Sequence, residues 1–152
     1  MSVNTKAAAS FIVVTLLSLV ACSDDAGPKS HVVSTDCWLG AINGDRTDTV
    51  RSAPGPISFG GWAADSTTNT APAEMAIKLT DSSGGSSLFS APKRLNRPDI
   101  VSVTNKNGYL MSGYDFTANG ASLVPGDYGI SIEMYRDKAI VSCGVSKKLI
   151  IK

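Results

Sequence analysis

Apolar and polar residues alternate one by one along much of the chain beyond residue 35, which is the pattern of β-strands that bury one face. The clearest case is the segment 128–134, in which Glu133 falls on the polar, solvent-facing side. Its apolar side is formed by Tyr128, Ile130, Ile132 and Met134. No segment keeps the three-and-four spacing of a helix for long. The pattern therefore predicts an all-β protein.

Eight further short segments have the same character and are predicted as strands. They cover residues 37–42, 57–64, 75–80, 86–90, 100–104, 114–117, 139–145 and 149–151. Turn-forming pairs such as Asn43-Gly44 and Pro125-Gly126 separate several of them, because these residues adopt positive φ or preset a turn. Many short strands joined by regular turns predict a sandwich or a barrel.

Two adjacent glycines interrupt the alternation in the segment 57–64. Strict alternation would place Phe59 and Trp62 on opposite faces of this strand. A bulge at Gly60-Gly61 would shift the parity by one residue, because glycine tolerates the bulge geometry. We therefore expect Trp62 to turn inward and join the core.

The N-terminus has the organisation of an export signal. A polar start with one positive charge, Lys6, is followed by an apolar run over residues 7–21. A membrane-spanning helix needs about 20 apolar residues, whereas a shorter run that ends in small residues is typical of a secretory signal peptide. The alternatives are an ordinary signal peptide with a chance cysteine near its end and an uncleaved N-terminal anchor helix.

The junction at the end of this run, Leu19-Val20-Ala21-Cys22, resembles the lipobox of bacterial lipoproteins. The resemblance implies cleavage after a signal peptide of residues 1–21 and diacylglycerol on the Cys22 sulfur, which holds the protein on a membrane. Ser23 after the cysteine is similar to the outer-membrane sorting pattern of Gram-negative lipoproteins. The expected location is the bacterial cell envelope, at the outer membrane, facing the periplasm or the surface.

The segment 22–34 is polar and contains Gly27-Pro28, so we predict a flexible tether ahead of a single domain at 35–152. The chain has three cysteines, and assigning Cys22 to the lipid leaves Cys37 and Cys143 as a pair. Export makes this pair oxidisable. The predicted disulfide would tie the two ends of the domain together.

The run Leu123-Val124-Pro125-Gly126-Asp127-Tyr128 is similar to the tyrosine corner of immunoglobulin-like and fibronectin type III sandwiches. In those domains a tyrosine at the start of a strand hydrogen-bonds back to the preceding turn. Trp62 would correspond to their core tryptophan. The resemblance implies an immunoglobulin-like antiparallel β-sandwich of about seven to nine strands. The cysteines lie at the ends of the domain, so it is not of the antibody type.

Charge excludes some classes of partner. After removal of residues 1–21, the chain has 13 acidic and 13 basic residues, because Lys6 is the only charged residue in the signal. A nucleic-acid-binding surface needs a clustered positive charge, and this balance offers none. The expected partners are therefore the membrane, through the lipid on Cys22, and an envelope protein or a polysaccharide.

The sequence carries no catalytic signature. Its only histidine, His31, lies in the predicted tether, which leaves no positioned base for a nucleophilic triad. No spacing typical of a metal site or a cofactor loop occurs, although Asp45 and Asp48 would allow a loop calcium site. Glu74 and Asp99 would be the acids of a small hydrolase if they met in a cleft. We predict no enzyme, no metal and no cofactor.

Aromatic side chains are the remaining candidates for binding. Trp38 follows the inward position of Cys37 and should point outward, while Tyr109 and Tyr114 lie near turns or strand ends. Exposed aromatic rings anchor protein partners or stack on sugars. The predicted function is a lipid-anchored module that docks another envelope protein through a sheet edge, loops or an aromatic patch. The alternative is a carbohydrate-binding module for cell-wall or surface polysaccharide, with these three rings as its platform.

Overall fold

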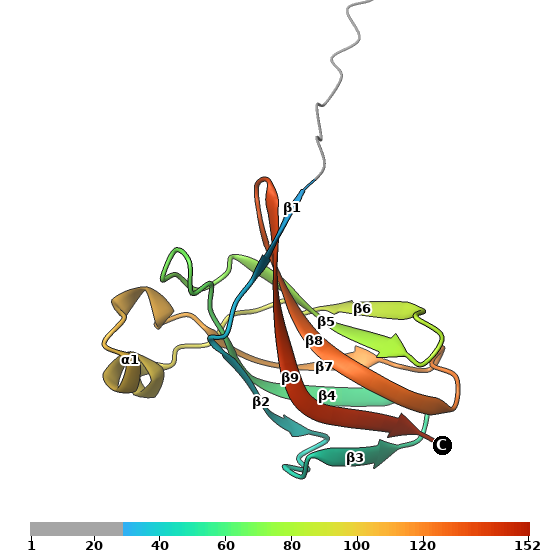
Figure 1. Cartoon of the computed structure of the whole chain (residues 1–152). Coiled ribbons are helices and arrows are strands. Elements are labelled where there is room, and N and C mark those ends of the chain that lie inside the picture. Colours follow the sequence, from blue (N-terminus) through green and yellow to red (C-terminus); the bar gives the residue numbers. More distant parts are fainter. Residues whose placement is uncertain (1–28) are drawn as a thin grey trace, which may run out of the picture.

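The structure, a computed structural model, describes residues 29–152. The predicted signal peptide and Cys22 lie outside the described residues. Two β-sheets pack face to face, and a small helical lobe lies at one end (Figure 1). The elements in chain order are β1 (Ser30–Val33), β2 (Cys37–Ile42), β3 (Thr49–Ser52), β4 (Pro56–Ala63), β5 (Glu74–Asp81), β6 (Ser86–Ser90), α1 (Pro98–Thr104), the short 3-10 helix η1 (Asn107–Tyr109), β7 (Gly113–Asn119), β8 (Gly126–Arg136) and β9 (Ala139–Ile151).

The larger sheet has the strand order β1-β9-β8-β5-β6, and the smaller sheet has the order β2-β4-β7. The long strand β9 also pairs with β3. Both β1 and β3 run parallel to β9, one along its first residues and one along its last, whereas all other pairs are antiparallel. This arrangement confirms the all-β sandwich predicted from the alternation.

The core lies between the two sheets and uses the residues that the alternation placed inward. Phe59 from the small sheet and Ile77 and Ile132 from the large sheet are fully buried. The predicted inward residues of β8 are all in the core as well. Phe59 packs on Phe116 with ring centroids 5.9 Å apart. Burial of these apolar surfaces is the main stabilising contribution to the fold.

The predicted disulfide is present. Cys37 and Cys143 are bonded across a Cα–Cα distance of 6.4 Å and a sequence separation of 106 residues. Cys37 belongs to β2 in the small sheet, and Cys143 belongs to β9 in the large sheet, where it is 1% exposed. The bond therefore joins the two sheets covalently.

The tyrosine at the start of β8 makes the hydrogen bond that the resemblance implied. The Tyr128 hydroxyl donates to the carbonyl oxygen of Val124, four residues earlier, at 2.8 Å. The ring is buried, while the preceding turn contains Gly126 at a φ of 152°. This contact fixes the turn between β7 and β8 against the core.

Tyr128→Phe is expected to lower the free energy of unfolding by about 1 kcal/mol, because it removes this hydrogen bond and leaves the Val124 carbonyl without its partner. Equilibrium unfolding in urea would measure the loss. An unchanged unfolding midpoint would show that the hydrogen bond contributes nothing.

Several segments differ from the sequence-based assignment. Residues 49–52, where no strand was predicted, form β3, and the strands predicted at 139–145 and 149–151 are one strand, β9. Residues 30–33, predicted as part of the tether, form β1, because Val32 packs against the core and the parallel edge of β9 accepts the strand. Residues 100–104, predicted as a strand, belong to the helix α1. Pro98 stands at its first turn and Asn105 adopts the left-handed conformation at its end, which are typical boundaries of a helix.

The bulge expected at Gly60-Gly61 of β4 is absent, and a bulge lies instead on the neighbouring strand β2. Gly40 of β2 is the extra residue, since Leu39 pairs with Gly61 and Ala41 pairs with Gly60. The register of β4 therefore stays regular, and Trp62 remains on the outer face of the small sheet. The expectation of Trp62 in the core was wrong. Its ring lies 6.4 Å from that of Tyr109.

Candidate functional site

The helical lobe closes one end of the sandwich. It is formed by residues 91–112, which connect β6 in the large sheet to β7 in the small sheet and include α1 and η1. Figure 1 shows the lobe next to the start of β2. Hydrogen bonds between Leu95 and Gly113 close the lobe where it joins β7. The lobe thus stands beside the first residues of β2.

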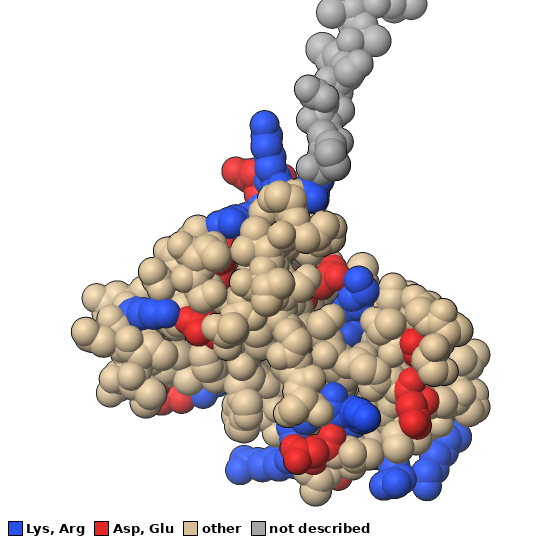
Figure 2. Space-filling view, in the orientation of Figure 1, with Lys and Arg blue, Asp and Glu red and all other residues tan. Residues whose placement is uncertain are grey.

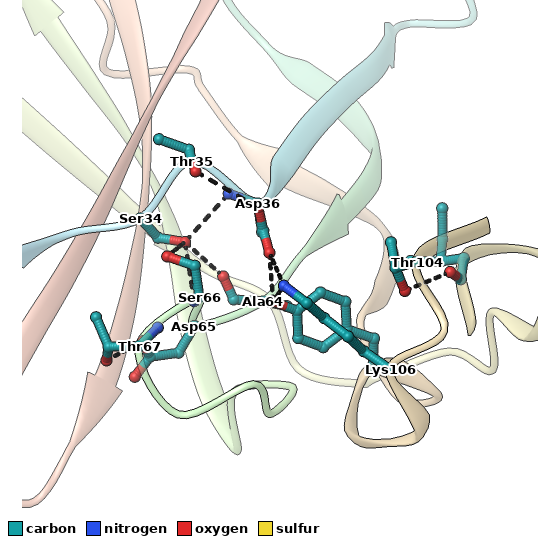
Figure 3. A network of polar contacts seen from close by, with 11 residues as sticks. Ser34, Thr35, Asp36, Ala64, Asp65, Ser66, Thr67, Thr104 and Lys106 are labelled. Atoms are coloured by element: carbon teal, nitrogen blue, oxygen red, sulfur yellow. Dashed lines mark hydrogen bonds and ion pairs between the residues drawn. The ribbon is translucent and has the colours of Figure 1, made fainter. Parts of the chain in front are cut away.

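Asp36, just before β2, is the point at which the lobe is attached (Figure 3). Lys106 Nζ donates to Asp36 Oδ2 at 2.8 Å and contacts the Tyr109 hydroxyl at 3.0 Å. The Tyr109 hydroxyl also donates to Asp36 Oδ2. Hydrogen bonds from Lys106 and Tyr109 lower the pKa of Asp36 below its ordinary value of 3.8.

The segment before Asp36 is held in the same way from its other side. The Ser34 hydroxyl donates to the carbonyl oxygen of Ala64 at 2.7 Å and lies 3.2 Å from the Ser66 hydroxyl (Figure 3). Ser34 is 2% exposed, so these are interior hydrogen bonds. The start of β2 is therefore clamped between the lobe and the loop that follows β4.

Acid should weaken this clamp. The depressed pKa of Asp36 means that its contribution to stability is present above 3.8 and is lost as the pH falls through the lower pKa of the folded state. Asp36→Asn is expected to be less stable than the wild type at pH 7, with the difference shrinking at more acidic pH. Thermal unfolding of both proteins from pH 7 to pH 2 would test this. A difference in Tm that is independent of pH would contradict it.

Trp38 stands two residues after this clamp and points outward, as the sequence predicted. Its side chain is 53% exposed. One side of the ring lies on Gly40, where an added Cβ would come within 2.6 Å of a ring carbon. The Tyr114 hydroxyl donates to the Trp38 carbonyl oxygen at 3.4 Å. The indole is thus seated on backbone, and much of its surface faces solvent.

A hollow of about 320 Å³ lies beside the indole on the outer face of the small sheet. Glycines form much of its floor, because no side chains stand at Gly60, Gly61 and Gly113. Charged side chains stand around it: Arg46, Arg97 and Asp115. We call Trp38, these three charged residues and the glycine floor the Trp38 surface.

Arg97 is held in place within this surface. Its guanidinium makes two hydrogen bonds to the Asp99 carboxylate, at 2.8 Å and 2.6 Å. The pairing raises the pKa of Arg97 and lowers that of Asp99. A bidentate pair of this kind fixes the plane of the guanidinium.

A second hollow also borders Trp38 and includes Cys37 of the disulfide in its lining. It shares Arg46 with the first hollow, and Asp48 and Lys147 complete its charged lining. Lys147 is 6% exposed, and its amine donates to the carbonyl oxygens of Arg46 at 2.5 Å and Thr47 at 2.7 Å. These bonds fix the loop between β2 and β3. Lys147 was not predicted as a structural residue, although it falls among the inward positions of β9.

The structure does not combine the three predicted binding aromatics into one platform. Tyr109 is 0% exposed and Tyr114 is 1% exposed, so neither presents a ring face to a ligand. Desolvation by burial raises the pKa of both phenols. Their hydroxyls instead hold Asp36 and the Trp38 backbone. Of the three residues, only Trp38 is available for contact.

The acids considered for hydrolysis lie apart. Glu74 lines a separate hollow beside Arg136, whereas Asp99 pairs with Arg97 at the start of α1. Glu133 was expected to face solvent but is 6% exposed, because Lys78 pairs with it at 2.9 Å and Tyr135 donates to it. Within residues 29–152, no three His, Cys, Asp or Glu side chains come together as a metal site would require.

The face of the molecule in Figure 2 shows no large area of one charge. Basic and acidic side chains are interspersed over the face in Figure 2, with uncharged residues between them. No helix within residues 29–152 has the length and apolar character to cross a membrane. Comparison of the chain with protein-family models, with curated proteins and with solved structures gives no match.

Proposed function

We propose that the chain is a lipid-anchored protein of the bacterial cell envelope whose β-sandwich docks another envelope protein through the Trp38 surface, without catalysis of its own. The observation that carries this proposal is the indole of Trp38, which is 53% exposed in a domain whose other aromatic residues are buried or half-buried. An exposed tryptophan in a rigid setting is typical of the residues that dominate protein interfaces.

The surroundings of the indole support a protein partner. Tryptophan and arginine are enriched among the residues that contribute most to binding, and here Trp38, Arg46 and Arg97 line the same hollow. The clamp at Asp36 and the Asp99 pair hold this surface in one conformation before binding. A preorganised surface loses less conformational entropy when a partner docks. The balanced charge suits recognition at short range rather than long-range steering.

The order of strand pairing supports an immunoglobulin-like sandwich. Domains of that type place strands A, B and E in one sheet and strands C, F and G in the other. In the proposed correspondence, the sheet β2-β4-β7 matches the order A-B-E, and the strands β9-β8-β5 match the order G-F-C. Tyr128 at the start of β8 then stands where the tyrosine corner of strand F is expected.

The proposed anchor rests on the lipobox and can be tested separately. Cys22→Ser is expected to abolish incorporation of labelled fatty acid and to move the protein from the membrane fraction to the soluble fraction. The disulfide should be unaffected, because it uses the other two cysteines. A Cys22→Ser protein that stays in the membrane fraction would contradict lipid anchoring at this residue.

A carbohydrate ligand is the second candidate, and one observation favours it. The indole of Trp38 lies on Gly40 and shows its other side to solvent, as a ring that stacks on a sugar does. Asp48 and Asp115 stand nearby and offer acceptors to hydroxyl groups. The buried Tyr109 and Tyr114 leave a single ring for this role, which is why we place the protein partner first.

The test is capture of bound molecules by a chemical crosslinker in intact cells that produce the full chain. We expect one dominant envelope protein, and we expect Trp38→Ala to reduce its capture about 30-fold, as for the loss of about 2 kcal/mol at a binding hot spot. Val124→Ala is the matched control, because Val124 is 61% exposed and lines neither hollow. Capture of glycan fragments alone would favour the second candidate.

A further inference from the structure

The outer edge of β6 is an unpaired row of backbone hydrogen-bonding groups. In an antiparallel pair, hydrogen-bonded and non-hydrogen-bonded residue pairs alternate. Ala91 N–H donates to the Met75 carbonyl at 3.0 Å, and Asp81 N–H donates to the Gly85 carbonyl at 2.9 Å. The odd-numbered residues of β6 therefore bond to β5, and the even-numbered ones direct their N–H and C=O groups away from the sheet.

The residues of this outward row are Ser86, Leu88 and Ser90, all of them exposed. No hydrogen bond within residues 29–152 uses their backbone groups on the outer side. The Leu88 side chain is 53% exposed. Its partner on β5 is Lys78, and the charge of Lys78 is neutralised by an ion pair with Glu133. The row is thus uncharged, apolar at its centre and open.

The other strands at sheet edges carry features that discourage further pairing. Charged or titratable side chains and bulges protect such edges. In the described part of the chain, β7 carries Asp115, β3 carries Arg51, β1 carries His31, and the bulge at Gly40 interrupts β2. β6 has neither a charge nor a bulge.

We propose that β6 pairs with β6 of a second copy of this chain, antiparallel and about a two-fold axis at Leu88. The row is its own complement, because Ser86 then faces Ser90 of the second copy and Leu88 faces Leu88. All three pairs are of the hydrogen-bonded type, so about six hydrogen bonds form across the axis. The two Leu88 side chains cover each other, and no like charges on these strands meet.

The dimer is weak and depends on concentration. A contact along one short strand buries less than the roughly 1,200 Å² of a stable interface. Confinement of both copies on one membrane, which the proposed lipid anchor would provide, raises their effective concentration. The contact is independent of the Trp38 surface, since none of the residues of β6 lines either of its hollows.

The test places a photo-crosslinking amino acid at position 90 of the full chain in cells. We expect a crosslinked dimer in which position 90 is joined to 86–88 of the second copy. Leu88→Glu should reduce its yield at least tenfold, because two carboxylates then meet at the axis. Val103→Glu is the matched control, since Val103 on α1 is 86% exposed and lies outside β6.

A charge-reversal experiment separates lost pairing from lost folding. Co-expression of Leu88→Glu and Leu88→Lys chains should restore the crosslink, because opposite charges then face each other across the axis. Trp38→Ala should leave the dimer intact, and Leu88→Glu should leave capture of the envelope protein intact. Only monomer, an adduct with a different protein, or an equal loss with Val103→Glu would overturn the proposal.

Discussion

Reduction of the Cys37–Cys143 disulfide is expected to lower the free energy of unfolding by about 2–5 kcal/mol. The bond closes a loop of more than one hundred residues, and its loss restores much of the freedom of the unfolded chain. It also joins β2 to β9, so that side chains of the two sheets are covalently linked. The total stability of a domain of this size is of the order of 5–15 kcal/mol, so a large fraction is at stake.

Urea unfolding with and without a reductant would measure this effect. The double variant Cys37→Ala, Cys143→Ala should match the reduced wild type and should not respond to the reductant, which makes it the control. Since Cys37 precedes Trp38 directly, faster hydrogen exchange along β2 should accompany the loss. An unfolding midpoint that is the same under both conditions would contradict the role assigned to the bond.

Gly61→Ala is expected to be the most damaging of the small substitutions, at about 3 kcal/mol. A Cβ at Gly61 would overlap the carbonyl oxygen of Trp38 and come within 2.6 Å of the Tyr114 hydroxyl. The first neighbour belongs to the backbone of β2 and the second to a buried side chain, so neither can move without a shift of its strand. The substitution should therefore displace Trp38 as well as destabilise the domain.

The neighbouring residue provides a sharp control. At Gly60 an added Cβ would meet only the Asp115 side chain, at an ordinary 3.9 Å. Gly60→Ala is thus expected to change the free energy of unfolding by less than about 0.5 kcal/mol. Chemical unfolding of both variants, together with the fluorescence of Trp38, measures the contrast. Equal effects at the two positions would show that β2 does not approach Gly61 as described.

The strands that could be predicted from the sequence are those that bury one face in the core and expose the other face to solvent. In β8 the alternation identified every inward residue, and in β2 it placed Trp38 outside. The disulfide followed from the number of cysteines and the export signal. These features depend on the local periodicity of apolar residues or on the number of cysteines, and both can be recognised in the sequence itself.

The features that were not predicted depend on contacts distant in sequence. Tyr109 is buried because the lobe folds back onto the start of β2, whereas Tyr114 lies on the inner face of β7 in the core, and nothing near either tyrosine indicates this. Trp62 stays outside because the bulge formed on the partner strand, where Gly40 was an equally suitable site. In α1, residues 100–103 contain three apolar residues, a pattern that fits a strand as well as a helix. The strand prediction rested on this pattern and not on the helix boundaries that Pro98 and Asn105 indicate.

The proposal that the Trp38 surface docks an envelope protein is tested most directly by a photo-crosslinking amino acid at position 46. Arg46 borders both hollows beside the indole, so a docked partner must lie within reach. Irradiation of cells with the full chain is predicted to join position 46 to one envelope protein, and Trp38→Ala should remove that adduct. An adduct that persists in the Trp38→Ala chain, or the absence of any protein adduct at position 46, would contradict the proposal.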